Sequence, residues 1–516
     1  MINLLDCTLR DGGYVNEWNW GFHTAKNIIN SLVKAGIDVV EVGFLRNINE
    51  YDQNITVCNR IEELNRLLPK DSKNTMFSAM AMRSNYDISK LSPYDGKGIE
   101  MIRITAHDYD IKEGLDFAAK VKEKGYKLSV NPINIMGYSD EQILWIINRV
   151  NEIQPFQFSI VDTFGSMKRR DLDRIVSLVD NNLNRDVRLS LHLHENMSLS
   201  CSLAQNFADK HLNRNIAIDG SLMGMGRIPG NLPIELIADY LNDSYAKSYD
   251  IDYLMDAIQD YISPLKGKTE WGYTPAYFLS ARFNLHRNYA EHYLNKPDIT
   301  NRDINHILSQ FDRNKATVFD AEYADHLYEK YKNNIIDDSE DRENLKVKLK
   351  GKVILLIAPG ASINSYKDKI ASFIDKNKPV IISVNFIPGE FKTDFAFFSN
   401  NKRLNFFYDR VCELIVTSNL FIEKADFVIN YNSLSGAFKQ DVNSLIMCMK
   451  LLENLEIEKV FVAGADGYVS GVKNYFDNSF KSYAEQKVDF NSEIADIMKN
   501  MNLDIEFITP SQYNIQ

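Results

Sequence analysis

The sequence predicts an α/β protein: a (β/α)8 barrel, then a helical region, then a C-terminal Rossmann-like α/β domain. Three observations lead to this prediction. In the first half of the chain, short β-rich runs alternate with amphipathic stretches. Eight such runs occur within roughly 240 residues, which fits a closed barrel better than an open sheet. The chain has 516 residues, more than a single hydrophobic core usually supports, so we expect at least two domains.

The strand candidates of the first half are short, and several are continuous apolar runs. This is the pattern of parallel strands that are covered on both faces. The eight candidates are residues 2–8, 37–42, 75–81, 99–104, 127–131, 156–161, 187–193 and 216–220.

The stretches between these strands carry apolar residues at helical spacing. The helix expected at 23–35 ends before Gly36, a common C-cap residue, and the helix at 139–153 opens with a capping box that begins at Ser139. The remaining helix candidates are residues 56–68, 86–91, 111–124, 168–182, 198–211 and 232–241.

Composition divides the chain into four parts. We expect the barrel at residues 1–255, a helical extension at 256–332, a polar and acidic linker at 333–350, and the Rossmann-like domain at 351–516. The expected helices of the extension are 275–293 and 303–310. In the last domain we expect one helix at 366–376 and strands at 352–358, 379–385, 395–398, 414–417, 427–431 and 459–463.

Charge and cysteine content exclude several classes of protein. The chain has 59 basic and 70 acidic residues, a balance that argues against a nucleic-acid or anionic-membrane partner. Its five cysteines are widely spaced and form no C-x-x-C pair, so we expect free thiols in a reducing compartment. Because there is neither a basic leader nor a run of about 18 apolar residues, we expect a cytoplasmic protein.

Two histidines give the strongest chemical signal. His192 and His194 are two residues apart in a predicted strand, so both side chains point to the same side. Asp11, just after the first strand, would lie at the same end of the barrel, where barrel active sites form. Two imidazoles and one carboxylate with open positions suit Mn²⁺, Mg²⁺, Co²⁺ or Zn²⁺. The alternative is a pair of polar histidines on a solvated strand.

Arg10 precedes the candidate ligand Asp11. Alone, an arginine at a barrel mouth would more often form a surface ion pair. Beside a divalent ion, it could instead stabilise an oxyanion that develops during the reaction of a 2-keto acid.

Three motifs together resemble the DRE-TIM metallolyase superfamily of TIM-barrel enzymes. They are Asp-Cys-Thr-Leu-Arg-Asp-Gly-Gly at 6–13, His-Leu-His at 192–194 and Gly-Arg-Ile-Pro-Gly-Asn at 226–231. The resemblance covers about residues 1–330 and is greatest to the 4-hydroxy-2-oxovalerate aldolases. That superfamily also includes hydroxymethylglutaryl-CoA lyase and isopropylmalate synthase.

The resemblance implies a role for each matched residue. Asp11, His192 and His194 would bind the divalent metal, and Arg10 would orient and stabilise the pyruvate enolate. We expect Mn²⁺ as the ion, with Mg²⁺, Co²⁺ or Zn²⁺ as alternatives. Glu41 would support the metal site and Arg10. The resemblance places Thr163 at a position that binds the substrate carboxylate. It also matches Asn231 to an asparagine that reaches the metal in the acyl-CoA branches.

Two tyrosines complete the candidate site. Tyr273 matches a tyrosine that lines the aldehyde pocket of the aldolases, although it could equally pack the helical region onto the barrel. Tyr14 stands where those aldolases carry a catalytic histidine, and a phenol with a pKa near 10 is a poorer base. Either Tyr14 acts with the help of the metal, or His23, His107 or a water takes this role, or the acceptor differs.

The sequence of the last domain predicts a fold but does not indicate a reaction. The turn Pro359-Gly360-Ala361-Ser362 joins a strand to a helix, so it fits either an ordinary βα turn or a phosphate cradle. Asp466 follows a second strand and could hold a ribose or a metal. Because the region loosely resembles nucleotide-binding sheets of pterin pyrophosphokinase-like proteins, we expect a nucleotide or phosphate ligand here.

The sequence therefore predicts a class II pyruvate aldolase. It would be a carbon–carbon lyase that depends on a divalent metal and joins or separates a 2-keto acid and an aldehyde, and it would form a homo-oligomer. Two alternatives remain open: a Claisen-type transferase that uses an acyl-CoA, and a barrel that lost its catalytic base and serves as a scaffold or sensor.

Overall fold

The fold comes from a computed structural model. It describes residues 1–227, 229–296, 299–404, 411–422, 424–435, 443–470, 474–477 and 490–513. Two compact units are present: Met1–Glu291 with Leu308–Phe319, and His292–Ile307 with Asp320–Gln516. Each unit is described by itself below.

The first unit contains a closed barrel of eight parallel strands, which confirms the predicted fold class. The strands are hydrogen-bonded in the order β1-β9-β8-β7-β6-β5-β4-β2, and pairing of β1 with β2 closes the ring. Their bounds are β1 (Ile2–Asp6), β2 (Val39–Leu45), β4 (Met76–Met82), β5 (Met101–Ala106), β6 (Lys127–Pro132), β7 (Gln157–Asp162), β8 (Arg188–Leu193) and β9 (Ile216–Gly220).

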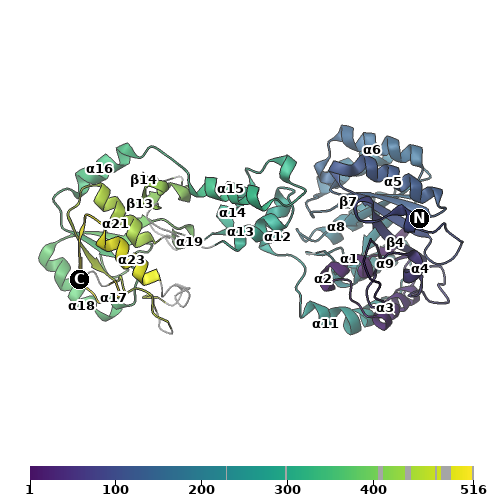
Figure 1. Ribbon diagram of the computed structural model, residues 1–516, viewed down its shortest axis with the longest axis horizontal. Helices are drawn as coiled ribbons and strands as arrows, with labels where there is room; N and C mark the ends of the chain where they lie inside the picture. The colour runs from purple at the N-terminus through teal and green to yellow at the C-terminus, as the bar shows by residue number, and fades with distance from the viewer. Residues whose placement is uncertain are drawn as a thin grey trace. The chain divides into compact units, whose positions relative to one another are not determined.

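Helices surround the barrel, as the purple and blue ribbon of Figure 1 shows. Because apolar residues recur on one side of each helix, that side packs against the strands, and the shared core includes Ile28, Ile146 and Val176. The predicted capping box at Ser139 is present, with Ser139 and Gln142 exchanging hydrogen bonds. The helices are α3 (Phe22–Lys34), α5 (Ile111–Glu123), α6 (Asp140–Ile153), α7 (Arg169–Asn182), α8 (Ser200–Ala208) and α9 (Ile234–Tyr245).

Two of the predicted helices differ from the structure, one in part and one completely. The stretch expected to be a helix at 56–68 begins as the short strand β3 (Val57–Cys58), because Val57 pairs with Phe44 of β2, and only α4 (Ile61–Asn65) is helical. The stretch at 86–91 forms no α-helix: a 3-10 turn covers Ile88–Lys90, after another at Arg83–Asn85.

The helical region after the barrel is more divided than the sequence suggested. The helix expected at 275–293 is two helices, separated near Asn284, whose backbone is left-handed with φ of 56°. The elements are α10 (Ile251–Ala257), a π-helical turn (Ile258–Ile262), α11 (Ser263–Lys266), α12 (Pro275–Arg282), α13 (Asn288–Leu294), α14 (Asn301–Leu308), a 3-10 turn (Arg313–Lys315) and α15 (Ala321–Lys332).

The second unit contains a parallel sheet with helices on both faces. Its strand order is β14-β13-β12-β11-β10-β15-β16. Neighbouring residues of β10 contribute to different cores. Leu355 packs in one core with Ile370 of α18 (Lys367–Asn377), and Leu356 packs in the other with residues of α21 (Ser444–Asn454). The strands are β10 (Ile354–Ile357), β11 (Val380–Val384), β12 (Phe395–Phe398), β13 (Glu413–Thr417), β14 (Phe427–Ile429), β15 (Lys459–Ala463) and β16 (Asp504–Phe507).

Sequence reasoning did not find β16, because Asp504 and Glu506 are exposed and make this edge strand look polar. Helix α16 (Ser339–Leu349) falls in the stretch expected to be a linker, and its Leu345 and Leu349 are buried in the core of the second sheet. The other helices are α17 (Ser362–Ser365), α18 (Lys367–Asn377), α19 (Asn401–Leu404), α20 (Tyr431–Ser435), α21 (Ser444–Asn454) and α23 (Phe490–Lys499). Within the described ranges, we find no helix that is both long and apolar enough to cross a bilayer.

Candidate metal centre

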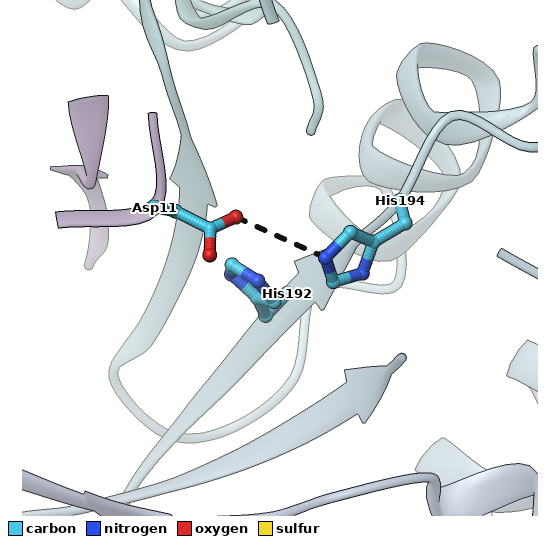
Figure 2. A group of neighbouring side chains, drawn as sticks. All are labelled: Asp11, His192 and His194. Atoms are coloured by element: carbon cyan, nitrogen blue, oxygen red, sulfur yellow. Dashed lines mark ion pairs between the residues drawn. The ribbon is translucent and has the colours of Figure 1, made fainter. Parts of the chain in front are cut away.

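Three side chains predicted as metal ligands meet at the C-terminal mouth of the barrel. Asp11 ends the helical turn α1 (Thr8–Asp11), which directly follows β1, while His192 and His194 come from the end of β8. Figure 2 shows the carboxylate and the two imidazoles turned toward one another. All three side chains are buried. One potential ligand atom from each, a carboxylate oxygen or an imidazole nitrogen, lies within 4.8 Å of the other two. This spacing allows one cation to contact all three.

Each imidazole is held by a hydrogen bond at its Nδ1 atom. The Nδ1 atom of His192 lies 3.2 Å from Oδ2 of Asp219, and that of His194 lies 2.9 Å from the backbone oxygen of Asp162. With Nδ1 as the donor, Nε2 keeps its lone pair, which is the arrangement of metal-binding histidines. The Nε2 atom of His194 is 3.9 Å from Oδ2 of Asp11.

The protonation states also suit a cation. Burial lowers the pKa of His194 to about 4, with a further contribution from neighbouring His192, so its imidazole is neutral at pH 7. Burial alone would raise the pKa of Asp11, but the Arg10 guanidinium holds it well below its usual range. At neutral pH the group therefore presents a carboxylate and a neutral imidazole.

Unpartnered oxygens test whether a cation fits. Oδ2 of Asp11 and Oδ1 of Asn231 are buried and have no hydrogen-bond partner among the described residues. A Cβ atom on Gly226 would lie 2.9 Å from that Asp11 oxygen and 2.2 Å from Nδ2 of Asn231, so glycine leaves this space open. A buried oxygen without a partner is costly, and a divalent cation would satisfy it. The residues present therefore fit a metal, with Asn231 beside the three ligands.

A buried chain of ion pairs runs beneath the centre. Arg10 contacts Asp11 and, through Nε at 2.7 Å, Oε2 of Glu41. Arg103 lies 3.0 Å from the same Glu41 oxygen and also pairs with Asp219. The three carboxylates outnumber the two guanidinium groups, so this buried chain has an excess of negative charge that a divalent cation would offset.

Asp219 and Arg103 are the residues that sequence reasoning missed. Arg103 lies in β5 and Asp219 in β9, both inside strands that the sequence predicts. A charged residue inside an otherwise apolar barrel strand was the available signal, since an unpaired buried charge is strongly disfavoured. Asp219 faces His192 in the register of β8 and β9, and its pKa is lowered to about 2, because Arg103 overcomes the effect of burial.

A small pocket adjoins the candidate ligand His194. Its lining includes predicted Thr163 and three basic residues, Arg227, His286 and Arg287. Nη2 of Arg227 donates to Nε2 of His286 over 2.8 Å. Burial lowers the pKa of His286 to about 3, and Arg227 adds to this effect, so the imidazole is neutral and accepts this bond. The lining carries two guanidinium groups and no carboxylate, which favours an anionic group of a substrate.

The remaining predicted residues differ in burial and in the groups that they contact. Glu41 is fully buried against Arg10, as expected for a supporting residue. Tyr14 is 39% exposed, its hydroxyl accepts a hydrogen bond from Arg46, and the Arg227 guanidinium lies 5.9 Å from its ring centroid. Tyr273 is 53% exposed and does not line the pocket beside His194.

The two histidines considered as substitutes for Tyr14 also differ in position. His107 stacks on Tyr109 with a centroid distance of 4.9 Å, and burial lowers its pKa. His23 is exposed on the first turn of α3 and contacts Phe22. Neither lines the pocket that contains His194.

Known proteins resemble the barrel half of the chain. An oxaloacetate decarboxylase of Mycobacterium tuberculosis is 22% identical over 273 residues, which are 52% of this chain and 78% of that protein. A 4-hydroxy-2-oxovalerate aldolase of Pseudoalteromonas translucida is 24% identical over 272 residues, 51% of this chain and 76% of that protein. Among solved structures, the N-terminal domain of a protein described as an aldolase, from Bacteroides vulgatus, has a TM-score of 0.48 at 24% identity; the match covers 57% of this chain and 96% of that one.

The HMGL-like family matches residues 1–260, half of the chain and the whole of the barrel. Aldolases and a decarboxylase among the relatives support a metal-dependent aldolase or lyase at the level of the family. A buried Asp/His/His group at the mouth agrees with that chemistry. The chain belongs to the HMGL-like family.

Proposed function

We propose that this chain is a carbon–carbon lyase that depends on a divalent metal and joins or separates a 2-keto acid, such as pyruvate, and an aldehyde. One observation carries the proposal: Asp11, His192 and His194 converge at the barrel mouth directly beside Arg10. A cation held there, with Mn²⁺ the expected ion, would act as a Lewis acid toward the keto oxygen of the substrate.

Arg10 supplies the charge stabilisation. The guanidinium is fixed by Asp11 and Glu41, and these contacts use two of its five N–H donors. Its remaining donors can contact an oxygen that gains negative charge when the C–C bond breaks. A donor fixed in a buried site needs no reorganisation as this charge develops, so it is effective.

Thr163 and Tyr14 complete the reaction. Thr163 lines the pocket with His194 and would bind the carboxylate of the 2-keto acid. Tyr14 stands at the mouth with its hydroxyl bonded to Arg46, and it would exchange a proton with the substrate hydroxyl. Tyr273 is exposed and does not line this pocket, so a contact between Tyr273 and the aldehyde rests on the family resemblance alone.

Arg227 and Arg287 suggest the kind of acceptor. Because these two cations line the pocket beside Thr163 and His194, we propose that the aldehyde carries an anionic group. The same feature favours a second candidate reaction: decarboxylation of a 2-keto diacid such as oxaloacetate, the substrate named for one relative.

A pyruvate-release assay tests the proposal. The full chain is loaded with Mn²⁺ and offered a panel of 4-hydroxy-2-keto acids and oxaloacetate, with pyruvate and CO2 measured separately. We expect pyruvate from at least one 4-hydroxy-2-keto acid, and none from the double variant His192→Ala/His194→Ala. Pyruvate only from oxaloacetate with matching CO2 would select the decarboxylase. No pyruvate from any compound would reject both reactions, and thiol release from acetyl-CoA would then support the Claisen alternative.

A further inference from the structure

A second cavity lies at the carboxyl ends of the parallel strands in the second unit. It holds about 1030 Å³ of space, including its opening to solvent. The lining comes from segments that follow strands β10, β11, β12, β15 and β16 and from the N-terminal end of α21. It includes Gly360, Asn385, Asn400, Lys402, Arg403, Asn443, Gly464, Asp466, Tyr468, Tyr475 and Tyr513.

The position of this cavity follows from the topology of the sheet. Strand β10 lies between β11 and β15, and the order of the strands along the sheet reverses there. Helix α18, which follows β10, contributes Ile370 to the core on one face, while α21, which precedes β15, contributes Ile446 to the core on the other. The loops at this point diverge toward opposite faces, and open α/β sheets bind ligands in the crevice that results.

Glycines allow two loops that line the cavity to pack directly against each other. The backbone N–H of Gly360 donates to the oxygen of Gly464 over 2.8 Å, so the loops after β10 and β15 are tied together. A Cβ atom on Gly360 would lie 2.3 Å from that oxygen. A Cβ atom on Gly464, where φ is +72°, would lie 2.1 Å from the oxygen of Ala358. Only glycine fits at either place, so the loops after β10 and β15 can approach each other closely at this end of the sheet.

The turn after β10 is not where a phosphate would bind. The Asp466 carboxylate accepts the backbone N–H of Ser362 over 2.7 Å and also the Ser362 hydroxyl. It therefore occupies a donor that a phosphate cradle would use, and it would repel an anion placed beside it. The cationic part of the lining is instead at α19, where Lys402 and Arg403 follow one another.

The rest of the lining suits a heterocyclic base and a sugar. Asn385 and Asn443 are held in place: Nδ2 of Asn385 donates to Oγ of Ser444 over 2.5 Å, and Oδ1 of Asn443 accepts the N–H of Leu445 over 2.9 Å. Amide side chains both donate and accept, as base edges and ribose hydroxyls require. Tyr468 and Tyr513 also line the cavity, and aromatic rings offer a face for stacking. The Tyr475 ring has the Arg403 guanidinium 5.0 Å from its centroid, so it borders the cationic part of the lining.

We propose that this cavity binds a nucleotide, with the base and ribose against the asparagines and tyrosines and the phosphates against Lys402 and Arg403. Amide, aromatic and cationic side chains line the same cavity, so groups suited to a base, a sugar and a phosphate lie together. The inference goes beyond the proposed lyase, because every residue that carries it belongs to the second unit.

Titration calorimetry of the full chain tests the assignment. The probes are the four common ribonucleoside monophosphates, the four diphosphates, the matching nucleosides and inorganic phosphate. We expect at least one nucleotide to bind with a micromolar Kd, and more tightly than its nucleoside or inorganic phosphate. Lys402→Gln and Arg403→Gln should each weaken that binding about tenfold or more.

Two matched variants make the result decisive. Lys376→Gln removes an exposed lysine from α18 of the same unit and should leave the affinity unchanged. His192→Ala/His194→Ala disrupts the barrel centre and should also leave it unchanged, so failure of the lyase proposal would not affect this test. The inference is overturned if no nucleotide binds, if inorganic phosphate binds equally well, if Lys402→Gln and Arg403→Gln have no effect, or if the barrel variant loses the binding.

Discussion

His192 and Asp219 face each other in the register of neighbouring strands β8 and β9, with His192 Nδ1 3.2 Å from Asp219 Oδ2. The carboxylate orients the imidazole, and Ser190 and Arg103 hold the carboxylate in turn. The same Asp219 therefore connects the candidate metal centre to the charged network inside the barrel.

Asp219→Asn should weaken metal binding without unfolding the barrel. The amide still fits, but it no longer increases the basicity of His192, and the loss of such a partner typically costs about 10- to 100-fold in metal affinity. Competition with a chelating dye measures the affinity for Mn²⁺. Asp209→Asn, at a carboxylate bonded to Tyr240 on the surface, is the control and should have no effect. Equal affinity in wild type and Asp219→Asn would contradict the ligand assignment for His192.

Arg10→Lys should keep the metal and lose turnover. Lysine retains the positive charge between Asp11 and Glu41 but lacks the fixed, planar set of donors. We expect kcat to fall about 100- to 1000-fold, as for removal of a donor to an oxyanion. Metal analysis and steady-state kinetics separate the two effects. The surface variant Arg149→Lys is the control, and activity within a few-fold of wild type in Arg10→Lys would exclude this role.

Tyr14→Phe should lower kcat about 100-fold or more, because the phenol would be the group that exchanges a proton with the substrate hydroxyl. Arg46 would lose its contact to the hydroxyl, while its packing on the Phe44 ring, 4.0 Å from the centroid, would remain. Steady-state kinetics of wild type and Tyr14→Phe, with the metal content of both measured in parallel, test this. An unchanged kcat would transfer the role to His107 or a water.

Arg227→Gln should weaken the reaction with an anionic aldehyde and leave metal binding unchanged. Loss of a charge-assisted hydrogen bond costs about 1.5–3 kcal/mol, so kcat/KM for an anionic aldehyde should fall about tenfold or more. A neutral aldehyde of similar size should be affected little, and Arg227→Lys should restore part of the loss. If both aldehydes lose equally, Arg227 does not select for charge.

His286 should make the barrel less stable in acid. Its folded pKa of about 3 is below the value near 6.5 of an unfolded histidine, so between these values the unfolded chain binds the extra proton. The free energy of unfolding should therefore fall as pH drops from 6.5 toward 3, by at most about 2 kcal/mol at pH 5. His286→Gln should remove this part of the loss.

Tryptophan fluorescence during urea unfolding measures this effect, with EDTA present throughout. All four tryptophans, at 18, 20, 145 and 271, lie in the first unit, so the signal follows the barrel. His23→Gln, at an exposed position, is the control and should keep the wild-type slope. An identical slope in His286→Gln would show that His286 titrates normally.

The sequence alone predicted the barrel, the second parallel sheet and the grouping of Asp11 with His192 and His194. Local rules were sufficient here, because strands alternate with helices and residues two apart share a strand face. The broken helix at Asn284 and the polar edge strand β16 were not predicted, since one depends on a left-handed residue and the other on pairing with β15.

The tertiary structure decided what lies around that group. In the sequence, His192 is 27 residues from Asp219, 89 from Arg103 and 94 from His286. No local pattern relates these three residues to His192. Closure of the barrel places the first two in a dry interior, where a charge must find a partner, and the helical region after the barrel brings His286 against Arg227. The cavity in the second unit likewise exists only because strands distant in sequence become neighbours in the sheet.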